Sequence, residues 1–210
     1  MIPELGLLFL IISTVLALLL ALVPLIATAR RNPYLLSYSK PLALWVPLAL
    51  CLSVACLVYS FVVNDFSVAY VANHSNTQLA IWYKVAAVWG SHEGSMLFWV
   101  TSMAVWGGYI AVRHIKEEPQ FISHCCAILA MVILGFNLFM LFTSNPFARM
   151  LPDIPIEGRD LNPILQDIGL IFHPPMLFLG YVGLTVCFAA AIAVLLAGNF
   201  SEKYAKLLRP

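Results

Sequence analysis

Charged residues are scarce in this sequence. Eleven Lys and Arg residues and ten Asp and Glu residues make up 10% of the 210 positions, whereas 62% are hydrophobic. Such a chain cannot form a water-soluble domain, because its apolar surface exceeds what a single core can hide. The formal net charge of +1 gives no sign of a nucleic-acid partner. The composition therefore indicates an integral membrane protein.

Charge is absent altogether from five long apolar runs. One Asp, Lys or Arg in the middle of a spanning helix costs roughly 2.5–3.5 kcal/mol, so its absence is typical of membrane spans. Runs of about 20 residues cross the hydrocarbon as helices. The sequence predicts an all-α polytopic fold with spans at Leu7–Ala27, Leu42–Val63, Ser95–Val112, Cys125–Phe142 and Met176–Gly198.

No basic residue precedes the first run, which is also too long for a signal-peptide core. Arg30 and Arg31 follow it, and cytoplasmic loops carry the excess of Lys and Arg. The sequence therefore predicts an outside N-terminus, an inside C-terminus and two sizeable outer loops. The inside would hold eight of the eleven cations, including Lys203, Lys206 and Arg209, and the outside Lys84, Arg149 and Arg159.

Several functional patterns are missing. The five runs contain no Asp, Glu, Lys or Arg, which argues against an ion- or proton-transporting subunit. None of the five cysteines forms a CxxC pair, and we interpret them as packing residues. The HExxH zinc pattern is also absent, because Met96 stands where the second histidine would be.

A proline-rich stretch, Leu161–Gly183, carries the most informative histidine. His173 precedes Pro174 and Pro175, and each proline disfavours the helical conformation for the residue before it. We expect Pro175 to be the first helical residue, which leaves His173 just outside the helix mouth. An imidazole there can bind a metal or can be merely solvated.

Aromatic residues gather before the third run. Trp82, Tyr83 and Trp89 lie in a segment expected to form a helix at the membrane surface. They form either an interfacial aromatic belt or an apolar platform for a planar ligand. Next, Gly90 permits close backbone approach, and Glu93 suits the start of a helix.

Other polar residues predict structural roles. His114 and His124 fall at the inner ends of spans and are expected to be solvated. Asn137, near mid-membrane, is expected to bond to a neighbouring helix. Asp160 and Asn162 can cap a short helix through Leu165.

Several motifs together resemble the CcmF/NrfE family, the membrane subunits of bacterial cytochrome c haem lyases. The resemblance covers the whole chain and includes MIPELG, YVANHSN, YKVAAVWGSHEGSMLFW, NPF and GRDLNPILQDIGLIFHPPMLFLGYVG. Ala80 stands where a proline is expected in the family. Family members are longer and carry the tryptophan-rich loop and the second haem-ligand histidine further along, so this chain is expected to be an N-terminal portion.

The resemblance implies cytochrome c maturation at the bacterial inner membrane, with the functional face in the periplasm. It implies that His173, the metal ligand of the HPP motif, binds iron of a b-type haem that is the substrate for thioether attachment. The implied partners are apocytochrome c, the haem chaperone CcmE, the subunit CcmH and the remaining C-terminal part of the lyase. The residues implied to bind haem are His173, Pro174, Pro175, Trp89, Gly90, His92 and Glu93.

A second function stays open. The chain can instead be a non-catalytic membrane scaffold that docks maturation partners and binds haem only when joined to the missing part. We expect the chain to act as a haem lyase only as part of a larger protein or complex, and to be inactive alone.

Overall fold

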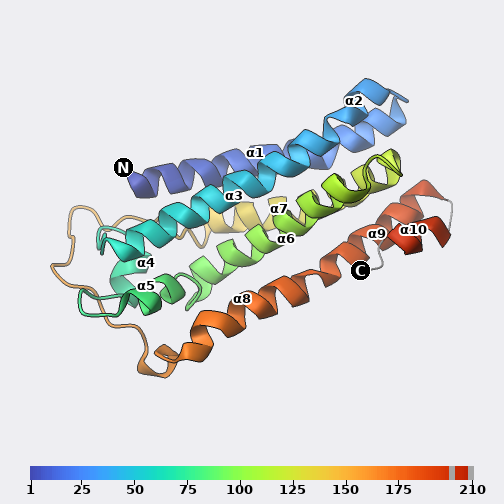
Figure 1. Cartoon of the computed structure of the whole chain (residues 1–210). Coiled ribbons are helices and arrows are strands. Elements are labelled where there is room, and N and C mark those ends of the chain that lie inside the picture. The colour runs from blue at the N-terminus through green and yellow to red at the C-terminus, as the bar shows by residue number, and fades with distance from the viewer. Residues whose placement is uncertain (199–201, 208–210) are drawn as a thin grey trace.

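The computed structural model describes residues 1–198 and 202–207, and most of these are helical (Figure 1). Five helical segments in this part are long and apolar enough to cross a membrane, which confirms the predicted class and number of spans. Arg209, one of the predicted inner cations, lies outside the described residues. The helices are α1 (Ile2–Ala29), α2 (Pro33–Ser37), α3 (Ser39–Val62), α4 (Ala69–His74), α5 (Ile81–Ala87), α6 (His92–His114), α7 (Pro119–Phe142), the short 3-10 helix η1 (Pro163–Leu165), α8 (Ile168–Val182), α9 (Leu184–Ala197) and α10 (Glu202–Leu207).

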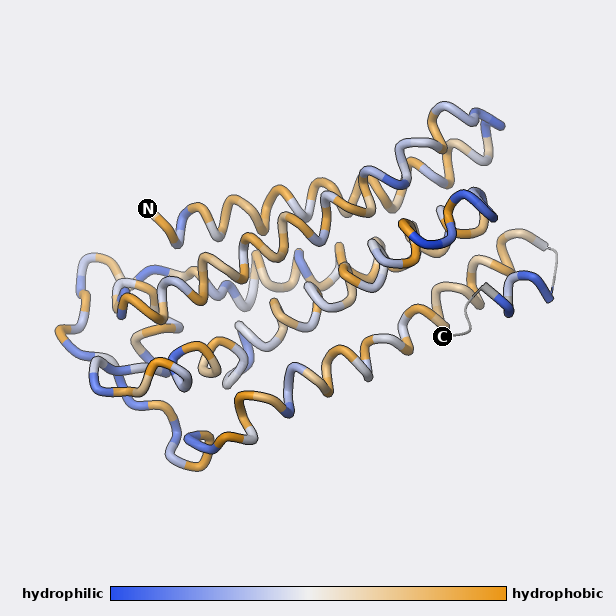
Figure 2. Tube along the Cα trace, in the orientation of Figure 1, coloured by the Kyte–Doolittle hydropathy of each residue, from blue (hydrophilic) through white to orange (hydrophobic). Residues whose placement is uncertain are grey.

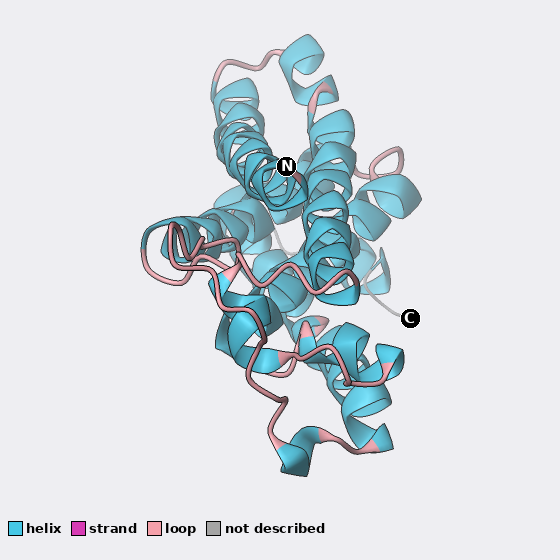
Figure 3. Cartoon of the chain, turned by 90° about the vertical axis from the view of Figure 1, so that its left-hand side faces the viewer, coloured by secondary structure: helices cyan, strands magenta, loops and turns pink. Residues whose placement is uncertain are grey.

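The packed centre consists of α1, α3, α6 and α7. Helix α1 lies against α3 and α7, α3 lies against α6, and α6 lies against α7 (Figures 1 and 3). Small and hydroxyl residues permit this close approach, as is usual between membrane helices. At Gly6 a Cβ would lie 2.3 Å from the Phe147 ring, and the Ser53 hydroxyl donates to the Gly6 carbonyl at 2.9 Å. As predicted, Asn137 bonds to a neighbouring helix, since its amide donates to Ser13 Oγ of α1 at 2.9 Å.

The connections gather at the two ends of the bundle. The N-terminus, α4, α5 and the 143–167 connection lie at one end, and α2 and the α6–α7 connection lie at the other (Figure 1). Hydrophobic residues run along the helices between these ends, and hydrophilic residues concentrate near them (Figure 2). Because the chain crosses the bundle five times, consecutive connections lie at alternate ends. Which end faces the outside stays a prediction.

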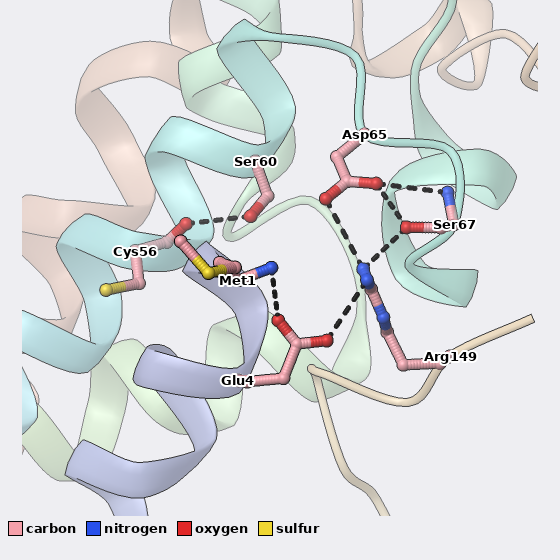
Figure 4. A network of polar contacts seen from close by, with 7 residues as sticks. All are labelled: Met1, Glu4, Cys56, Ser60, Asp65, Ser67 and Arg149. Carbon is pink, nitrogen blue, oxygen red and sulfur yellow. Dashed lines mark hydrogen bonds and ion pairs between the residues drawn. The ribbon is translucent and has the colours of Figure 1, made fainter.

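Arg149 ties together three segments at the N-terminal end. Its guanidinium lies 3.0 Å from Glu4 Oε1 of α1 and 3.3 Å from Asp65 Oδ2 of the α3–α4 connection (Figure 4). It also donates to the Ser67 hydroxyl. Backbone bonds beside it, including Ala69 N to the Ala148 carbonyl at 2.8 Å, form an isolated antiparallel bridge. The 143–167 connection is therefore fixed to the bundle.

The predicted start of the fifth span is wrong. Helix α8 begins at Ile168 instead of near Pro175, and the Asp167 side chain caps it by accepting from Gly169 N at 2.7 Å. Pro174 and Pro175 therefore lie inside the helix, and His173 lies in its second turn. The span divides at Gly183, where α8 ends and α9 begins.

The prediction for His124 is also wrong. Its side chain is buried, with a residue exposure of 4%, and its Nε2 lies 2.9 Å from Thr28 Oγ1 of α1. The position at a span end suggested solvent, but the imidazole is covered because α1 packs directly on α7. His114 is half-buried, 3.7 Å from Glu117.

Candidate functional site

His173 projects from the second turn of α8 and is exposed. It borders a shallow depression of about 350 Å³ at the N-terminal end of that helix. Most of the depression is apolar, and Asp167 and His173 supply its ionisable groups. Its lining residues are Ile164, Leu165, Asp167, Gly169, Leu170, His173 and Pro174. The arrangement offers an imidazole at the edge of an apolar hollow.

His173 differs from the other four histidines in having no polar partner. Within residues 1–198 and 202–207, its imidazole makes no hydrogen bond or ion pair. The others have one each: His74 Nδ1 with the Tyr70 carbonyl at 2.9 Å, His92 with Ser144, His124 with Thr28, and His114 with Glu117. A neutral imidazole with a free ring nitrogen is a metal ligand.

Helix α8 continues through its two prolines with help from a tryptophan. A helical Pro174 has no N–H to give to the carbonyl four residues earlier, which is that of Leu170. The indole Nε1 of Trp89 donates to this carbonyl instead, at 2.8 Å. Trp89 of the WGSHEGS motif and the HPP helix are therefore in direct contact, and this contact joins the two blocks that carry most of the family resemblance.

A second tryptophan repeats the arrangement near the end of α8. Trp106 of α6 donates from its indole Nε1 to the Leu179 carbonyl at 2.9 Å. Between the two indoles, Phe98 packs against Phe178 of α8, with ring centroids 5.9 Å apart. Phe98 also contacts the Trp89 ring at 5.4 Å. Only Val182 of α8 is buried, so these few contacts with the α5–α6 region carry much of its attachment.

The WGSHEGS motif forms a tight turn around the Tyr70 hydroxyl. This hydroxyl lies 3.2 Å from the Ala87 carbonyl and 3.1 Å from the Val88 carbonyl, and it accepts from Ser91 N at 3.2 Å. Burial raises the pKa of Tyr70 well above its ordinary value. A Cβ at Gly94 would lie 1.8 Å from the Val88 carbonyl oxygen. The second glycine of the motif is therefore required by close approach.

Helix α6 begins with His92 and Glu93. Neither residue lies beside His173. His92 Nδ1 lies 2.9 Å from Ser144 Oγ, and its ring lies 6.2 Å from that of Phe139 in α7. Glu93 is in the first turn of α6, as predicted. The structure thus brings Trp89 to the HPP helix and turns His92 toward α7.

The 150–162 segment crosses α4 and α5 and leads to the depression. Arg159 N donates to the Ala72 carbonyl at 2.6 Å. Thr77 donates through its hydroxyl and its backbone N–H to Glu157, which lowers the pKa of that carboxyl. Asn162 caps η1, as predicted, by accepting from Ile164 N at 3.1 Å.

The described residues contain no cluster of three or more His, Cys, Asp or Glu side chains that could hold a metal ion. His173 can therefore supply one bond to a metal whose other ligands come from a macrocycle or another chain segment. Axial ligation by histidine is one way in which proteins hold haem iron.

Two features of the site lay outside what we inferred from the sequence. The role of Trp106 and the clamp at Arg149 depend on contacts between residues 73 and more positions apart. Their only signal in the sequence is residue type: an indole or a guanidinium next to an apolar run.

The fold and the site define a polytopic all-α membrane protein in which, among the described residues, one histidine without a polar partner lies in a helix that contains two prolines. A family model for cytochrome C assembly proteins matches residues 89–209, and the chain belongs to this family.

Individual relatives agree with this membership and confirm the resemblance to CcmF and NrfE. The whole chain is 50% identical to the cytochrome c-type biogenesis protein CcmF of Escherichia coli K12, covering 32% of it. It is 46% identical to NrfE of Haemophilus influenzae, covering 33% of it. A solved structure named cytochrome c haem lyase CcmF has the same fold, with a TM-score of 0.83, 22% identity, and coverage of 99% of this chain and 32% of that one. The chain thus spans about a third of the length of these proteins.

Proposed function

We propose that this chain takes part in cytochrome c maturation by supplying His173 as one axial ligand to a haem held for attachment to apocytochrome c. The observation that carries the proposal is the state of the five histidines. Four have a polar partner, whereas His173 is exposed and has none among the described residues. An imidazole kept free of internal bonds is available to iron.

The surface beside His173 suits a flat apolar macrocycle. Ile168, Phe172 and Met176 are spaced four residues apart, so they lie along one side of α8. Their exposed fractions are 67%, 63% and 72%. Together with the apolar wall of the depression, they offer hydrophobic contact next to the nitrogen that binds the metal.

The proposed reaction joins two thiols of a CxxCH motif to the two haem vinyl groups. Each sulfur forms a bond to a vinyl carbon, and the thiol hydrogen ends on the neighbouring carbon, so the step is an addition without net oxidation. The contribution of this chain is to hold the substrate haem by its iron, because fixed geometry converts an encounter into a local reaction. The second axial ligand comes from outside this chain.

The remaining motif residues are proposed to form the haem-handling region around this ligand. Pro174 lines the depression, Pro175 removes a second backbone donor from the helix, and Trp89 contacts the same helix. Gly90, His92 and Glu93 belong to the adjoining turn and are proposed to shape it.

The proposed setting is the bacterial inner membrane, with the His173 end of the bundle in the periplasm. The proposed partners are apocytochrome c, the haem chaperone CcmE, the subunit CcmH and the C-terminal two thirds found in longer relatives. The motif resemblance implies these partners, and the loops at the His173 end are where they would dock.

The test replaces His173 by Ala in a chain extended to the full length of its relatives and records the Soret spectrum of the purified protein. We expect loss or a clear shift of the haem signal from this face. His74→Ala is the matched control, because His74 is also at the N-terminal end but already bonds to Tyr70. An unchanged Soret band in His173→Ala contradicts the proposal.

A further inference from the structure

We infer that Trp89 is a positioning residue: by bonding to the carbonyl that Pro174 leaves without a helical donor, it fixes the segment of α8 that carries His173. The inference concerns the helix itself, and its bearing on haem rests on the proposed function. Trp89 acts here through Leu170 and does not need to touch haem.

The bond compensates for a specific deficit. In a regular helix the N–H of residue 174 would bond to the Leu170 carbonyl, and Pro174 has none. A carbonyl left without a donor near the hydrocarbon costs free energy, because no water replaces the lost bond. The Trp89 indole supplies that donor at 2.8 Å.

The donor is itself held in place. Trp89 N bonds to the Ala86 carbonyl at 3.1 Å, which extends the turn at the end of α5. Its ring packs against Phe98 of α6. The turn that follows closes around the buried Tyr70 hydroxyl. The surrounding turn and Phe98 thus fix the Trp89 N–H, whereas Pro174 and Pro175 leave α8 without two backbone donors. The position of Trp89 therefore sets the position of this part of α8.

Helix α8 has few other restraints at this level. Val182, its buried residue, and Phe178, which contacts Phe98, both lie toward the other end of the helix. The second indole bond, from Trp106 to Leu179, is nine residues from Leu170, or about 13 Å along the axis at 1.5 Å per residue. The first turns of α8 also have the Asp167 cap and the partly buried Leu170 side chain, which packs against the core. Among the described residues, the Trp89 indole supplies the one hydrogen bond that reaches these turns from a distant part of the chain.

The experiment measures His173 without haem, in the full-length protein in detergent. The probe is diethylpyrocarbonate, and the rate of His173 carbethoxylation is followed by mass spectrometry. Trp89→Phe keeps an aromatic ring and removes the N–H, and we expect it to change the His173 rate at least about threefold. Trp106→Phe is the matched control, because it removes the same kind of bond from the same helix at a distance; we expect less than about a 1.5-fold change.

A double variant decides whether the Leu170 carbonyl is the link. Pro174→Ala restores a backbone N–H that can bond to this carbonyl, which makes the indole donor redundant. The effect of Trp89→Phe on the His173 rate should then shrink to within about 1.5-fold in the Pro174→Ala background. An undiminished effect overturns the inference, as does an unchanged rate in Trp89→Phe or an equal change in Trp106→Phe.

Haem spectra of the same variants separate this inference from the proposed function. If both hold, the low-spin electron paramagnetic resonance signal of ferric haem shifts in Trp89→Phe and stays the same in Trp106→Phe. If His173→Ala leaves the haem spectrum unchanged while Trp89→Phe still alters His173 reactivity, the proposed function fails and the positioning role stands.

Discussion

At the scale of single residues, Gly94 shows how little space the turn before α6 contains. A Cβ there would lie 1.8 Å from the Val88 carbonyl oxygen and 2.9 Å from the Tyr70 hydroxyl. The backbone would have to move away from the hydroxyl that the turn surrounds. The motif glycine therefore reflects packing as well as any role in haem handling.

We predict that Gly94→Ala destabilises the protein by about 2 kcal/mol or more, because overpacking forces backbone shifts. The measurement is thermal unfolding of the purified protein in detergent. Gly135→Ala is the control, since nothing lies within 4 Å of a Cβ at Gly135 in α7. Alanine favours a helix over glycine by up to about 1 kcal/mol, so this variant should be neutral or slightly more stable. Equal melting temperatures for the two variants would contradict the close packing at Gly94.

The buried His124 depends on one hydroxyl. Thr28 Oγ1 donates to the Pro24 carbonyl at 3.0 Å, so its remaining lone pairs are free to accept from His124 Nε2–H at 2.9 Å. The geometry assigns a proton to His124 Nε2.

We predict that Thr28→Val, which keeps the shape and removes the hydroxyl, costs about 1–3 kcal/mol because His124 is left with a buried unpaired donor. Thr28→Ser retains the hydroxyl and should recover most of that loss. Unfolding in detergent monitors both variants. A Thr28→Val protein as stable as wild type would mean that the imidazole finds another partner.

At the scale of elements, α8 is the helix whose boundaries depend most on non-local contacts. Its cap is local: Asp167 accepts from Gly169 N, and Asp167 precedes the first helical residue. An aspartate at this position typically contributes about 1 kcal/mol. Capping lets the helix begin seven residues before Pro175.

We predict that Asp167→Ala frays the first turn of α8 and increases amide hydrogen exchange at residues 168–171 several-fold, as expected for a loss of about 1 kcal/mol. Asp160→Ala is the control, because the Asp160 side chain makes no bond to any described residue. Equal amide hydrogen exchange in Asp167→Ala and Asp160→Ala would show that the Asp167 cap does not stabilise the first turn of α8.

The difference between the predicted and observed start of α8 shows which features are local. Apolar runs of spanning length and the cap at Asn162 could be predicted, because each depends on nearby residue types. For Asn137 the sequence predicted a bond to a neighbouring helix but not its partner, Ser13, which lies 124 positions away. The rule that prolines end helices is also local, and it predicted a start near Pro175. It was wrong because Trp89, 81 positions from Leu170, supplies the missing donor.

Only part of the candidate site could likewise be predicted from the sequence. The motif predicts His173 as the ligand, and this role stays a prediction; the structure shows that the side chain is exposed. Its place inside a helix, the separate surroundings of His92 and the use of the Trp89 N–H all require tertiary contacts. No pattern along the chain specifies which carbonyl an indole will meet.

At the scale of the whole molecule, Arg149, which lies in the long connection before α8, forms ion pairs with Glu4 at the start of α1 and with Asp65 in the α3–α4 connection (Figure 4). Two carboxylates at once require the planar fork of arginine. Its side chain is 27% exposed, so solvent weakens each pair but does not remove them.

We predict that Arg149→Met lowers stability by about 1–3 kcal/mol, since Asp65 and Glu4 lose a shared partner. The same variant should make the 143–167 connection more sensitive to limited proteolysis. Arg159→Met is the matched control: this arginine is exposed, lies in the same connection and has no side-chain ion pair among the described residues. Equal protease sensitivity in both variants would show that the clamp does not hold the connection.

The charges at the two ends predict the orientation of the whole bundle. The end that carries α2 and the α6–α7 connection holds Arg30, Arg31 and Lys116, and cytoplasmic loops carry such an excess of cations. We predict that a cysteine introduced at Asp153 reacts with a membrane-impermeant maleimide in intact spheroplasts, whereas one at Glu117 reacts only after lysis. The parent chain, with its five native cysteines, gives the background. The opposite pattern of labelling would place His173 on the cytoplasmic side, away from the compartment where haem attachment is proposed, and would overturn the orientation and the proposed function together.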